Sequence, residues 1–455
     1  MSRYSVVPSI ALKPNDPLIF GSLDGGSKDL VVVGRLNESG PLHNVVMDVT
    51  GETVIAIFGK RGSGKSYTLG VLAEGLCTAA TETDIGRCSQ RKAAILLDTL
   101  NIFWSTANPF TSETDKSQFQ REILQLSTWR IRPPELEVSV WVPNGFRSDH
   151  TPESFRDFSI PAYELTAEDI ADLFDLDLQR DPMGQMLSEV QEKTYVQKRD
   201  YSFEDMIDLM NSDPEITEFY APATLRAARQ RLRSIVRNPL FLSANSTPLS
   251  DLLIPGHLAV IELGDLPNSM RAVITSVLLR RIQAERSRAS DAEKQLLLNT
   301  RLSSVERERL TSFLTTAIPP SWVLIDEAQN TLPSNRQVKS SDAVVRFVRE
   351  GRNFGLSFGF TTQQPSAVDQ RILSQADTVI CHKLTIASDI IKMRENLKCA
   401  EPKEVHVGQQ SMDLGSWVRS LERGQAIVTN AEFDRVFAIE IRPRVCPHGG
   451  TGFVN

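Results

Sequence analysis

The sequence predicts an α/β fold with a largely parallel central sheet. A β-branched apolar run at 54–58 is followed by a glycine-rich loop and then by residues at helical spacing over 67–76. Two further apolar runs, at 93–97 and 322–325, lack the alternation of a half-exposed strand. Such continuous runs are typical of strands buried on both faces of a parallel sheet. Both runs end in a carboxylate, which would lie at the edge where α/β proteins bind their ligands.

The glycine-rich loop has the pattern G-x-x-x-x-G-K-S and ends in Lys65 and Ser66. Glycines permit a tight turn that brings backbone N–H groups up to an anion, and the following helix N-terminus adds free donors and a positive dipole end. Lys65 would reach the outer phosphates, and the Ser66 hydroxyl would ligate Mg²⁺. The alternative is an accidental glycine-rich turn, against which the preceding strand and following helix argue. The residues predicted to hold the phosphates are Gly59, Arg61, Gly62, Ser63, Gly64, Lys65 and Ser66.

The apolar run at 322–325 ends in two carboxylates, Asp326 and Glu327. Downstream of a phosphate loop, Asp326 would hold Mg²⁺ through water, and Glu327 would polarise the attacking water. A second carboxylate beside the metal-binding one favours hydrolysis over stable nucleotide storage. A purely structural strand end is the alternative. The sequence therefore predicts a site for ATP and Mg²⁺ with Glu327 in a catalytic role.

Three further residues are catalytic candidates. Gln363 follows the strand-like run 356–362 and could sense the terminal phosphate or orient water. Arg349 and Arg352 belong to a helix end that stops at a glycine. Phosphoryl transfer gains greatly from an arginine supplied in trans, so either residue is a candidate to act on a neighbouring subunit's nucleotide. A salt bridge on the helix is the alternative for both arginines.

For each of two charged features, the sequence allows two interpretations. Asp98 follows the run at 93–97, where it would face the ligand crevice or would cap a turn. A predicted helix at 222–238 places four arginines on one side, and such a stripe can track a phosphate backbone or form a solvated face paired with carboxylates. We favour the solvated face. These arginines are Arg226, Arg229, Arg233 and Arg237.

The length of 455 residues favours roughly three domains. Capping-box spacings begin several helices in the middle of the chain, and a long helical stretch is expected over 269–314, with breaks near 290 and 303. The expected parts are a short N-terminal β segment or reduced barrel-like cap (1–45), the first part of the core (46–104), a mainly helical insertion (105–250), the second part of the core (251–441) and an extended C-terminal tail (442–455).

Composition restricts the class of protein. The 50 basic and 57 acidic residues give a net charge of −7, which argues against a protein that coats nucleic acid over its whole surface but does not exclude a local basic channel. No apolar run approaches the ~20 residues of a membrane-spanning helix, so we expect no membrane partner. The five cysteines form no Cys-x-x-Cys pair, which predicts a reduced, cytoplasmic compartment without a disulfide framework or zinc module.

The order of these motifs resembles the HerA/FtsK superfamily of hexameric DNA-pumping ATPases, and HerA in particular. The block from Arg352 to Gln375 carries the resemblance most specifically, and the likeness runs from about residue 25 to the end, weakly across the insertion. The matching motifs are the 59–66 loop with Tyr67-Thr68, Asp98, the segments 324–329, 350–356, 362–366 and 372–375, and the closing His448-Gly449-Gly450. Two departures are a shorter N-terminal segment and the absence of a glycine-containing turn after Asp98.

The resemblance implies a RecA-like P-loop NTPase core, with Walker A at 59–66 and Walker B at 324–327, and Tyr67 beside the nucleotide. It also implies a homo-hexameric ring with double-stranded DNA in its channel, and a partner that is often the NurA nuclease. Relatives pair instead with sirtuin-type or nuclease effectors in anti-phage defence. We therefore expect an ATP-hydrolysing DNA translocase or helicase-like motor working with such an effector. The alternative is a nucleotide-dependent ring scaffold that assembles and regulates an effector enzyme without moving DNA.

Overall fold

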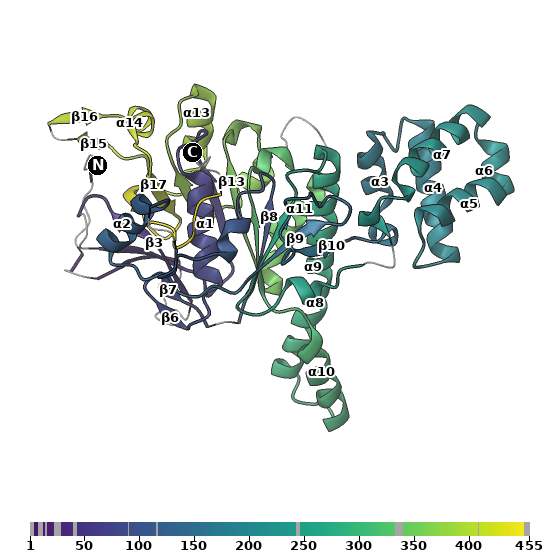
Figure 1. Ribbon diagram of the computed structural model, residues 1–455, viewed down its shortest axis with the longest axis horizontal. Coiled ribbons are helices and arrows are strands. Elements are labelled where there is room, and N and C mark those ends of the chain that lie inside the picture. The colour runs from purple at the N-terminus through teal and green to yellow at the C-terminus, as the bar shows by residue number, and fades with distance from the viewer. Residues whose placement is uncertain are drawn as a thin grey trace.

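A computed structural model gives the chain one large mixed sheet with helices on both faces (Figure 1). It describes residues 4–7, 12–13, 16–21, 29–39, 43–89, 91–114, 117–242, 246–332, 340–407 and 409–449. From one edge to the other, the strands are β10 Arg156–Phe158, β9 Val138–Pro143, β11 Leu258–Glu262, β8 Ala93–Asp98, β12 Ser321–Ile325, β13 Leu356–Thr362, β5 Val54–Phe58, β14 Thr378–Cys381, β17 Gln425–Asn430, β18 Phe437–Ile441, β3 Leu30–Leu36, β4 Asn44–Asp48 and β2 Leu18–Phe20. The short strands β6 Glu82–Thr83 and β7 Gly86–Arg87 lie beside β3.

The part of the sheet from β10 to β14 is entirely parallel. Every residue of β5, β8, β12 and β13 is buried, because helices cover both faces of these strands. This confirms the predicted α/β fold. In a parallel block all carboxyl ends share one edge, so the segments that follow β5, β8, β12 and β13 are brought together.

The helices against the sheet include α1, which directly follows the phosphate loop and lies across the middle of the molecule (Figure 1). The helices outside the helical lobe are α1 Lys65–Leu76, α2 Gln120–Trp129, α8 Leu249–Leu252, α9 Asn268–Leu298, α10 Ser304–Thr316, α11 Ser340–Glu350, α12 Gln370–Leu373, α13 Ala387–Glu395 and α14 Leu414–Ser420, of which α10 projects away from the sheet (Figure 1). The expected break near residue 290 is wrong, since α9 is continuous there and the Ser290 hydroxyl donates to the Asn353 carbonyl. The break near 303 is confirmed, and Ser303 caps α10 there.

A lobe of five helices projects from one end of the sheet (Figure 1). Its members are α3 Ala167–Phe174, α4 Pro182–Gln197, α5 Phe203–Ser212, α6 Pro214–Phe219 and α7 Pro222–Val236. The capping boxes expected at Thr166 and Ser202 are both present. The start of the expected insertion 105–250 differs from the expectation, because β9 and β10 within it pair with the core strand β11 and with each other.

The N-terminal strands extend the central sheet. β3 pairs with β18, β4 pairs with β3, and β2 pairs with β4. β1 Ser5–Val7 instead forms a small antiparallel sheet with β15 Glu404–Val407 and β16 Gln410–Met412. The described residues of the segment 1–45 therefore form no separate barrel-like cap, because the buried side of β3 packs directly against α1. No helix in the described residues is long and apolar enough to cross a lipid bilayer.

Candidate nucleotide-binding site

The phosphate loop joins β5 to α1 and has the backbone that its glycines allow. Gly62 and Gly64 have φ values of 75° and 116°, in the region that side chains rarely adopt. A Cβ atom at Gly59 would lie 2.4 Å from the Ser63 hydroxyl oxygen and 2.9 Å from the His382 Cβ atom. No side chain caps the N-terminus of α1, so the backbone N–H groups of its first turn stay available to an anion. The loop therefore fits a phosphate group.

The two halves of the predicted site meet. The Ser66 hydroxyl donates to Asp326 Oδ1 at 3.0 Å, and the Lys65 ammonium forms an ion pair with Glu327. All four residues are buried. Serine hydroxyl and carboxylate oxygens are the kind of ligands that Mg²⁺ accepts, and this ion usually adds phosphate oxygens and waters to one or two protein ligands. Ser66 and Asp326 therefore fit a magnesium ion bound to a nucleotide.

Glu327 is held on every side. Its backbone is left-handed, with φ 53° and ψ 56°, a conformation that costs a non-glycine residue about 1–3 kcal/mol and is typical of functional sites. Gln363 donates to its Oε1 at 2.6 Å, and Gln329 donates to its Oε2 at 2.6 Å. The Glu327 N–H donates to the Thr361 hydroxyl at 3.0 Å. The carboxylate is therefore fixed in direction by groups that follow β12 and β13.

Asp326 lies among groups that control its charge. Burial and the neighbouring Glu327 carboxylate raise the pKa of Asp326 to about 6, against the opposing effect of a hydrogen bond from Thr361. That hydrogen bond, from the Thr361 hydroxyl to Asp326 Oδ1, is 2.5 Å long. A buried carboxylate of this kind gains from a nearby cation, which offsets the cost of its burial.

Asp98 has a structural role in this geometry. Its carboxylate accepts backbone N–H groups of Leu100 at 3.1 Å, Ile102 at 2.7 Å and Phe103 at 2.6 Å. It thereby organises the turn after β8, which includes Asn101 at a positive φ of 53°. Burial raises the pKa of Asp98 to about 7. Of the two interpretations, these contacts favour the turn aspartate.

Arg349 and Arg352 lie away from this chain's phosphate loop. Arg349 pairs with Glu350 at 3.2 Å, and Arg352 forms an ion pair with Asp377. Asp377 also accepts the Val54 N–H at 2.8 Å, at the amino end of β5. The five residues of β5 put that edge on the order of 15 Å from the loop. Both guanidiniums are more than half exposed. A role for either arginine on a neighbouring subunit's nucleotide stays a prediction.

The arginines of α7 lie on its outer side, while Leu225, Leu232 and Ile235 are buried. Arg226, Arg233 and Arg237 are exposed, and Arg229 donates to the Met210 carbonyl at 3.3 Å. Within the described part of the chain, none of the four forms an ion pair. Three of the four arginines are therefore solvated and Arg229 is half-buried, and the ion pairs with carboxylates that were expected for the stripe are not found among the described residues.

His382 was missing from the predicted site and lies directly behind the phosphate loop. Its Nδ1 lies 2.9 Å from the Gln425 carbonyl, and its Nε2 lies 2.8 Å from the Thr68 hydroxyl. Because a carbonyl only accepts, Nδ1 carries the proton and Nε2 accepts from Thr68. Burial lowers the pKa of His382 to about 4, so the ring is neutral at ordinary pH. His382 could have been identified from its position directly after β14, because β14 is the strand beside β5.

Thr361 and Gln329 were also missing from the predicted site, although both stand in motifs at the carboxyl ends of β13 and β12. A pocket of about 260 Å³ opens beside Lys65 and Ser66. Tyr67, which the family resemblance placed near the nucleotide, is in its wall. Residues of α2 and of the C-terminal tail, including His448 of the closing family motif, complete this wall, although nothing in the sequence indicated that they lie beside the phosphate loop.

Comparison with known proteins agrees with this geometry. Residues 31–282, more than half of the chain, match the family described as "Helicase HerA, central domain", and residues 259–413 match the family described as "Zonular occludens toxin (Zot)". The chain is 26% identical over 213 residues to the DNA double-strand break repair helicase HerA of Pyrococcus furiosus, covering 45% of this chain and 36% of that protein. It is 30% identical over 112 residues to HerA of Saccharolobus solfataricus, covering 24% of this chain and 20% of that protein.

Two known structures share the fold at low sequence identity. VirB4 of Thermoanaerobacter pseudethanolicus is 11% identical, with a TM-score of 0.51 and coverage of 92% of this chain and 98% of that chain. The plasmid coupling protein TrwB, in complex with a non-hydrolysable ATP analogue, is 12% identical, with a TM-score of 0.51 and coverage of 88% and 87%. The chain belongs to the family of the HerA helicase central domain, as the order of its motifs predicted.

Proposed function

We propose that this chain is the ATP-hydrolysing subunit of a homo-hexameric motor that moves double-stranded DNA through the channel of its ring. The observation that carries the proposal is the meeting of Lys65 and Ser66 with Asp326 and Glu327 at the carboxyl edge of the sheet. Family membership supports it, since relatives in this family are named DNA double-strand break repair helicases. The likeness to TrwB with a bound ATP analogue supports the nucleotide.

Each residue has a definite part in this proposal. The loop N–H groups and Lys65 bind the phosphates, while Ser66 and Asp326 hold Mg²⁺, which when bound neutralises charge on the transferring phosphoryl group. Lys65 forms an ion pair with Glu327 in the structure. When Lys65 turns to the phosphates, the Glu327 carboxylate is released to accept a proton from the attacking water. Gln363 and Gln329 keep that carboxylate in place during the exchange.

The ring and its partner extend the same proposal. The side chains of Arg349 and Arg352 are more than half exposed, which supports the proposal that one of them acts on a neighbouring subunit's nucleotide. A net charge of −7 requires the DNA-contacting channel to gather basic residues locally. We propose that a nuclease or a sirtuin-type effector docks on the ring and works together with the motor.

The test is the ATP hydrolysis rate of the purified chain, with and without linear duplex DNA and with the product of the neighbouring gene. Stimulation by duplex DNA alone is expected for a motor. A rate that ignores DNA and responds only to the partner protein contradicts translocation and supports a ring scaffold. Glu327→Gln serves as the background control, because residual hydrolysis in that variant measures contaminating ATPases.

A further inference from the structure

We propose that the C-terminal segment 443–448 and helix α2 form the nucleoside subsite of this chain, which binds the base and ribose of the nucleotide whose phosphates lie on the 59–66 loop. The inference rests on the proposed nucleotide binding and goes beyond it by naming the elements that select the nucleoside. Neither element contains a phosphate-binding motif. Their role follows from the pocket that they close.

The pocket begins at the phosphate loop and continues away from Asp326 and Glu327. Lys65 and Ser66 form its inner end, and its wall includes Tyr67, Trp129 and His448. The volume of this pocket is about 260 Å³. The space therefore extends beyond the phosphates on the side where the rest of a nucleotide must go.

Three aromatic rings give the pocket its chemistry. The rings of Tyr67 and His448 meet edge to face, with centroids 5.7 Å apart. Trp129, at the end of α2, is held in place by Arg35, whose guanidinium lies 4.1 Å from the Trp129 ring centroid and donates to the Trp129 carbonyl at 3.0 Å. Aromatic faces bind nucleobases by stacking, and the rim adds the polar Gln125. A planar base with an attached ribose fits this wall.

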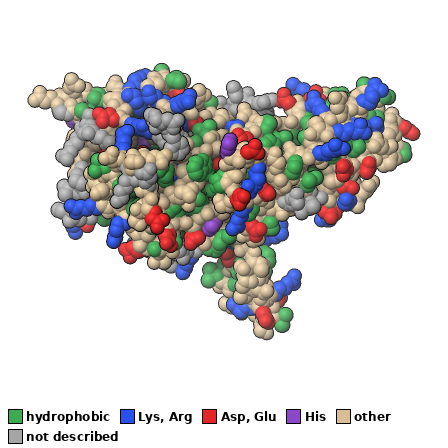
Figure 2. Space-filling model, viewed as in Figure 1, with side chains coloured by type: hydrophobic (Ala, Val, Ile, Leu, Met, Phe, Trp, Pro, Cys, Tyr) green, Lys and Arg blue, Asp and Glu red, His purple; other side chains and the backbone are tan. Residues whose placement is uncertain are grey.

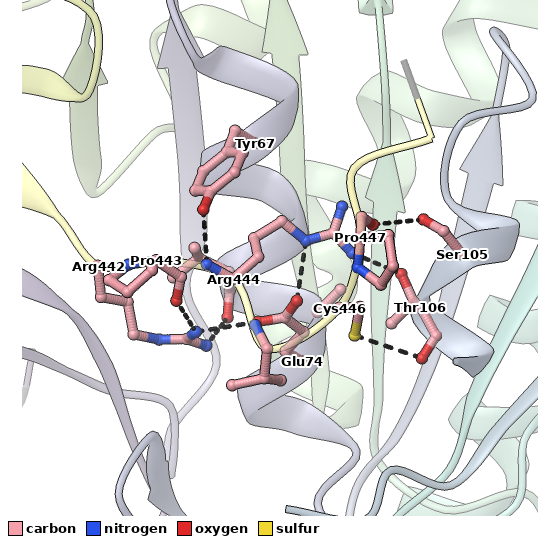
Figure 3. Close-up of polar contacts among 12 residues, drawn as sticks. Tyr67, Glu74, Ser105, Thr106, Arg442, Pro443, Arg444, Cys446 and Pro447 are labelled. Atoms are coloured by element: carbon pink, nitrogen blue, oxygen red, sulfur yellow. Dashed lines mark hydrogen bonds and ion pairs between the residues drawn. The ribbon is translucent and has the colours of Figure 1, made fainter. Parts of the chain in front are cut away.

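A buried charge cluster attaches the segment to α1 (Figure 3). Glu74 accepts from Arg442 at 2.9 Å through one carboxylate oxygen and from Arg444 at 2.8 Å through the other. All three side chains are buried. Burial alone would raise the pKa of Glu74, but the two guanidiniums outweigh it and the pKa is lowered, so the carboxylate stays charged. The tail is therefore fixed to the same helix whose first residues are Lys65 and Ser66.

Close packing sets the position of the segment along α1. The Arg444 N–H donates to the Tyr67 hydroxyl at 2.7 Å, which ties the tail to a wall residue of the pocket (Figure 3). A Cβ atom at Gly70 would lie 2.7 Å from the Arg444 guanidinium carbon, and one at Gly449 would lie 2.6 Å from the Ile102 carbonyl. Both glycines are therefore needed for this approach. Contacts made by the residues before and after His448 hold its side chain in the pocket wall.

Figure 2 shows basic and acidic side chains interspersed over the face in view. The wall of the pocket likewise carries charges of both signs, Arg121 and Arg423 with Glu122 and Glu440. Base recognition through stacking and a polar rim needs no net charge, unlike the phosphate end. The phosphate end is therefore expected to bind any polyphosphate, and the other end only a ligand that carries a base.

The test measures dissociation constants for ATP and for inorganic tripolyphosphate, both with Mg²⁺, by calorimetry. We expect His448→Ala and Trp129→Ala to weaken ATP binding about tenfold, the size of a lost stacking contact, and to leave tripolyphosphate binding within about twofold of wild type. His406→Ala, on β15 and outside the pocket wall, is the matched control and should change neither.

The proposal is overturned if both pocket variants bind ATP as wild type does, or if they weaken ATP and tripolyphosphate equally, since a merely structural tail predicts the latter. Lys65→Ala separates this failure from that of the proposed function. It should weaken both ligands, whatever the tail does. If Lys65→Ala binds both ligands normally, the nucleotide site itself is wrong.

Discussion

Ser66 donates a hydrogen bond to Asp326 at 3.0 Å, although 260 positions separate the two residues in the chain. The contact exists because β5, which leads to Ser66, and β12, which leads to Asp326, both flank β13 in the parallel block. A serine hydroxyl and a carboxylate so placed form a candidate magnesium site without further movement of the backbone. The predictions below depend on this arrangement.

Lys65→Ala should weaken ATP binding about 10- to 100-fold. The lysine is buried and has no role in the described structure other than its ion pair with Glu327, and a hydrogen bond to a charged group contributes about 1.5–3 kcal/mol. Calorimetric titration with ATP and Mg²⁺ measures the loss. Lys392→Ala, on the surface helix α13, is the control. Unchanged affinity in Lys65→Ala would remove the loop from nucleotide binding.

Glu74→Gln should lower the free energy of unfolding by about 3–5 kcal/mol, because it leaves two buried guanidiniums without their carboxylate. Urea denaturation followed by circular dichroism measures this. Glu404→Gln, an exposed glutamate on β15, should stay within about 0.5 kcal/mol of wild type. Equal stability of the two variants would show that the cluster does not hold the tail to α1.

Acidification should destabilise the protein partly through His382. In the unfolded chain this histidine takes up a proton below about pH 6.5, its ordinary value, whereas in the folded chain its pKa is about 4. Between these values the unfolded state binds more protons, so the folded state loses stability as the pH falls. The loss attributable to His382 between pH 7 and pH 5 is roughly 2 kcal/mol.

The matched variant for this effect is His382→Asn, because an asparagine amide can replace the Nδ1–H donor to Gln425 but does not titrate. Unfolding free energies of wild type and variant are compared at pH 7 and pH 5. The variant should lose about 2 kcal/mol less than wild type over this interval. His448, whose pKa burial also lowers to about 4, contributes equally to both proteins and cancels. An identical loss in both proteins would contradict the neutral buried ring.

Arg352→Ala should impair ATP turnover without unfolding the subunit. Its ion pair with Asp377 is about half exposed, so its removal should cost no more than about 1 kcal/mol. If the arginine acts in trans, rings mixed from Arg352→Ala and Glu327→Gln subunits should regain activity, because some junctions then combine an intact Glu327 with an intact Arg352. Mixed rings as inactive as either parent would exclude that role. Arg349→Ala, measured in the same way, shows which arginine acts.

The sequence predicted those parts of the site that follow a strand. Asp326 and Gln363 directly follow strand-like runs, and Lys65 follows one through the glycine-rich loop. The carboxyl ends of parallel strands must share an edge, so the meeting of these residues could be expected without coordinates. The fold class followed from the same runs. The order of the motifs also predicted the family, because the segments 350–356 and 362–366 are specific where the phosphate loop is not.

The parts that were not predicted depend on contacts between segments without local pattern. Nothing near Glu74 in the sequence indicates that its carboxylate meets Arg442 and Arg444, several hundred positions away. Strand β9 ends in a loop-rich stretch of prolines and glycines, and β10 Arg156–Phe158 contains a single apolar residue, so neither has a clear strand pattern. The N-terminal strands were expected to form either a small cap or a lead-in sheet, and the sequence could not decide between them because it does not show that β3 pairs with β18.

The most direct test of the account is ATP binding and ATP turnover measured side by side for Glu327→Gln. The amide keeps the shape of the side chain but cannot accept a proton, so we predict ATP affinity within about threefold of wild type and turnover at least 100-fold lower, the range of a lost general base. Glu404→Gln, measured in parallel, should match wild type in both. Turnover of Glu327→Gln close to wild type would contradict the assignment of this site as the centre of ATP hydrolysis.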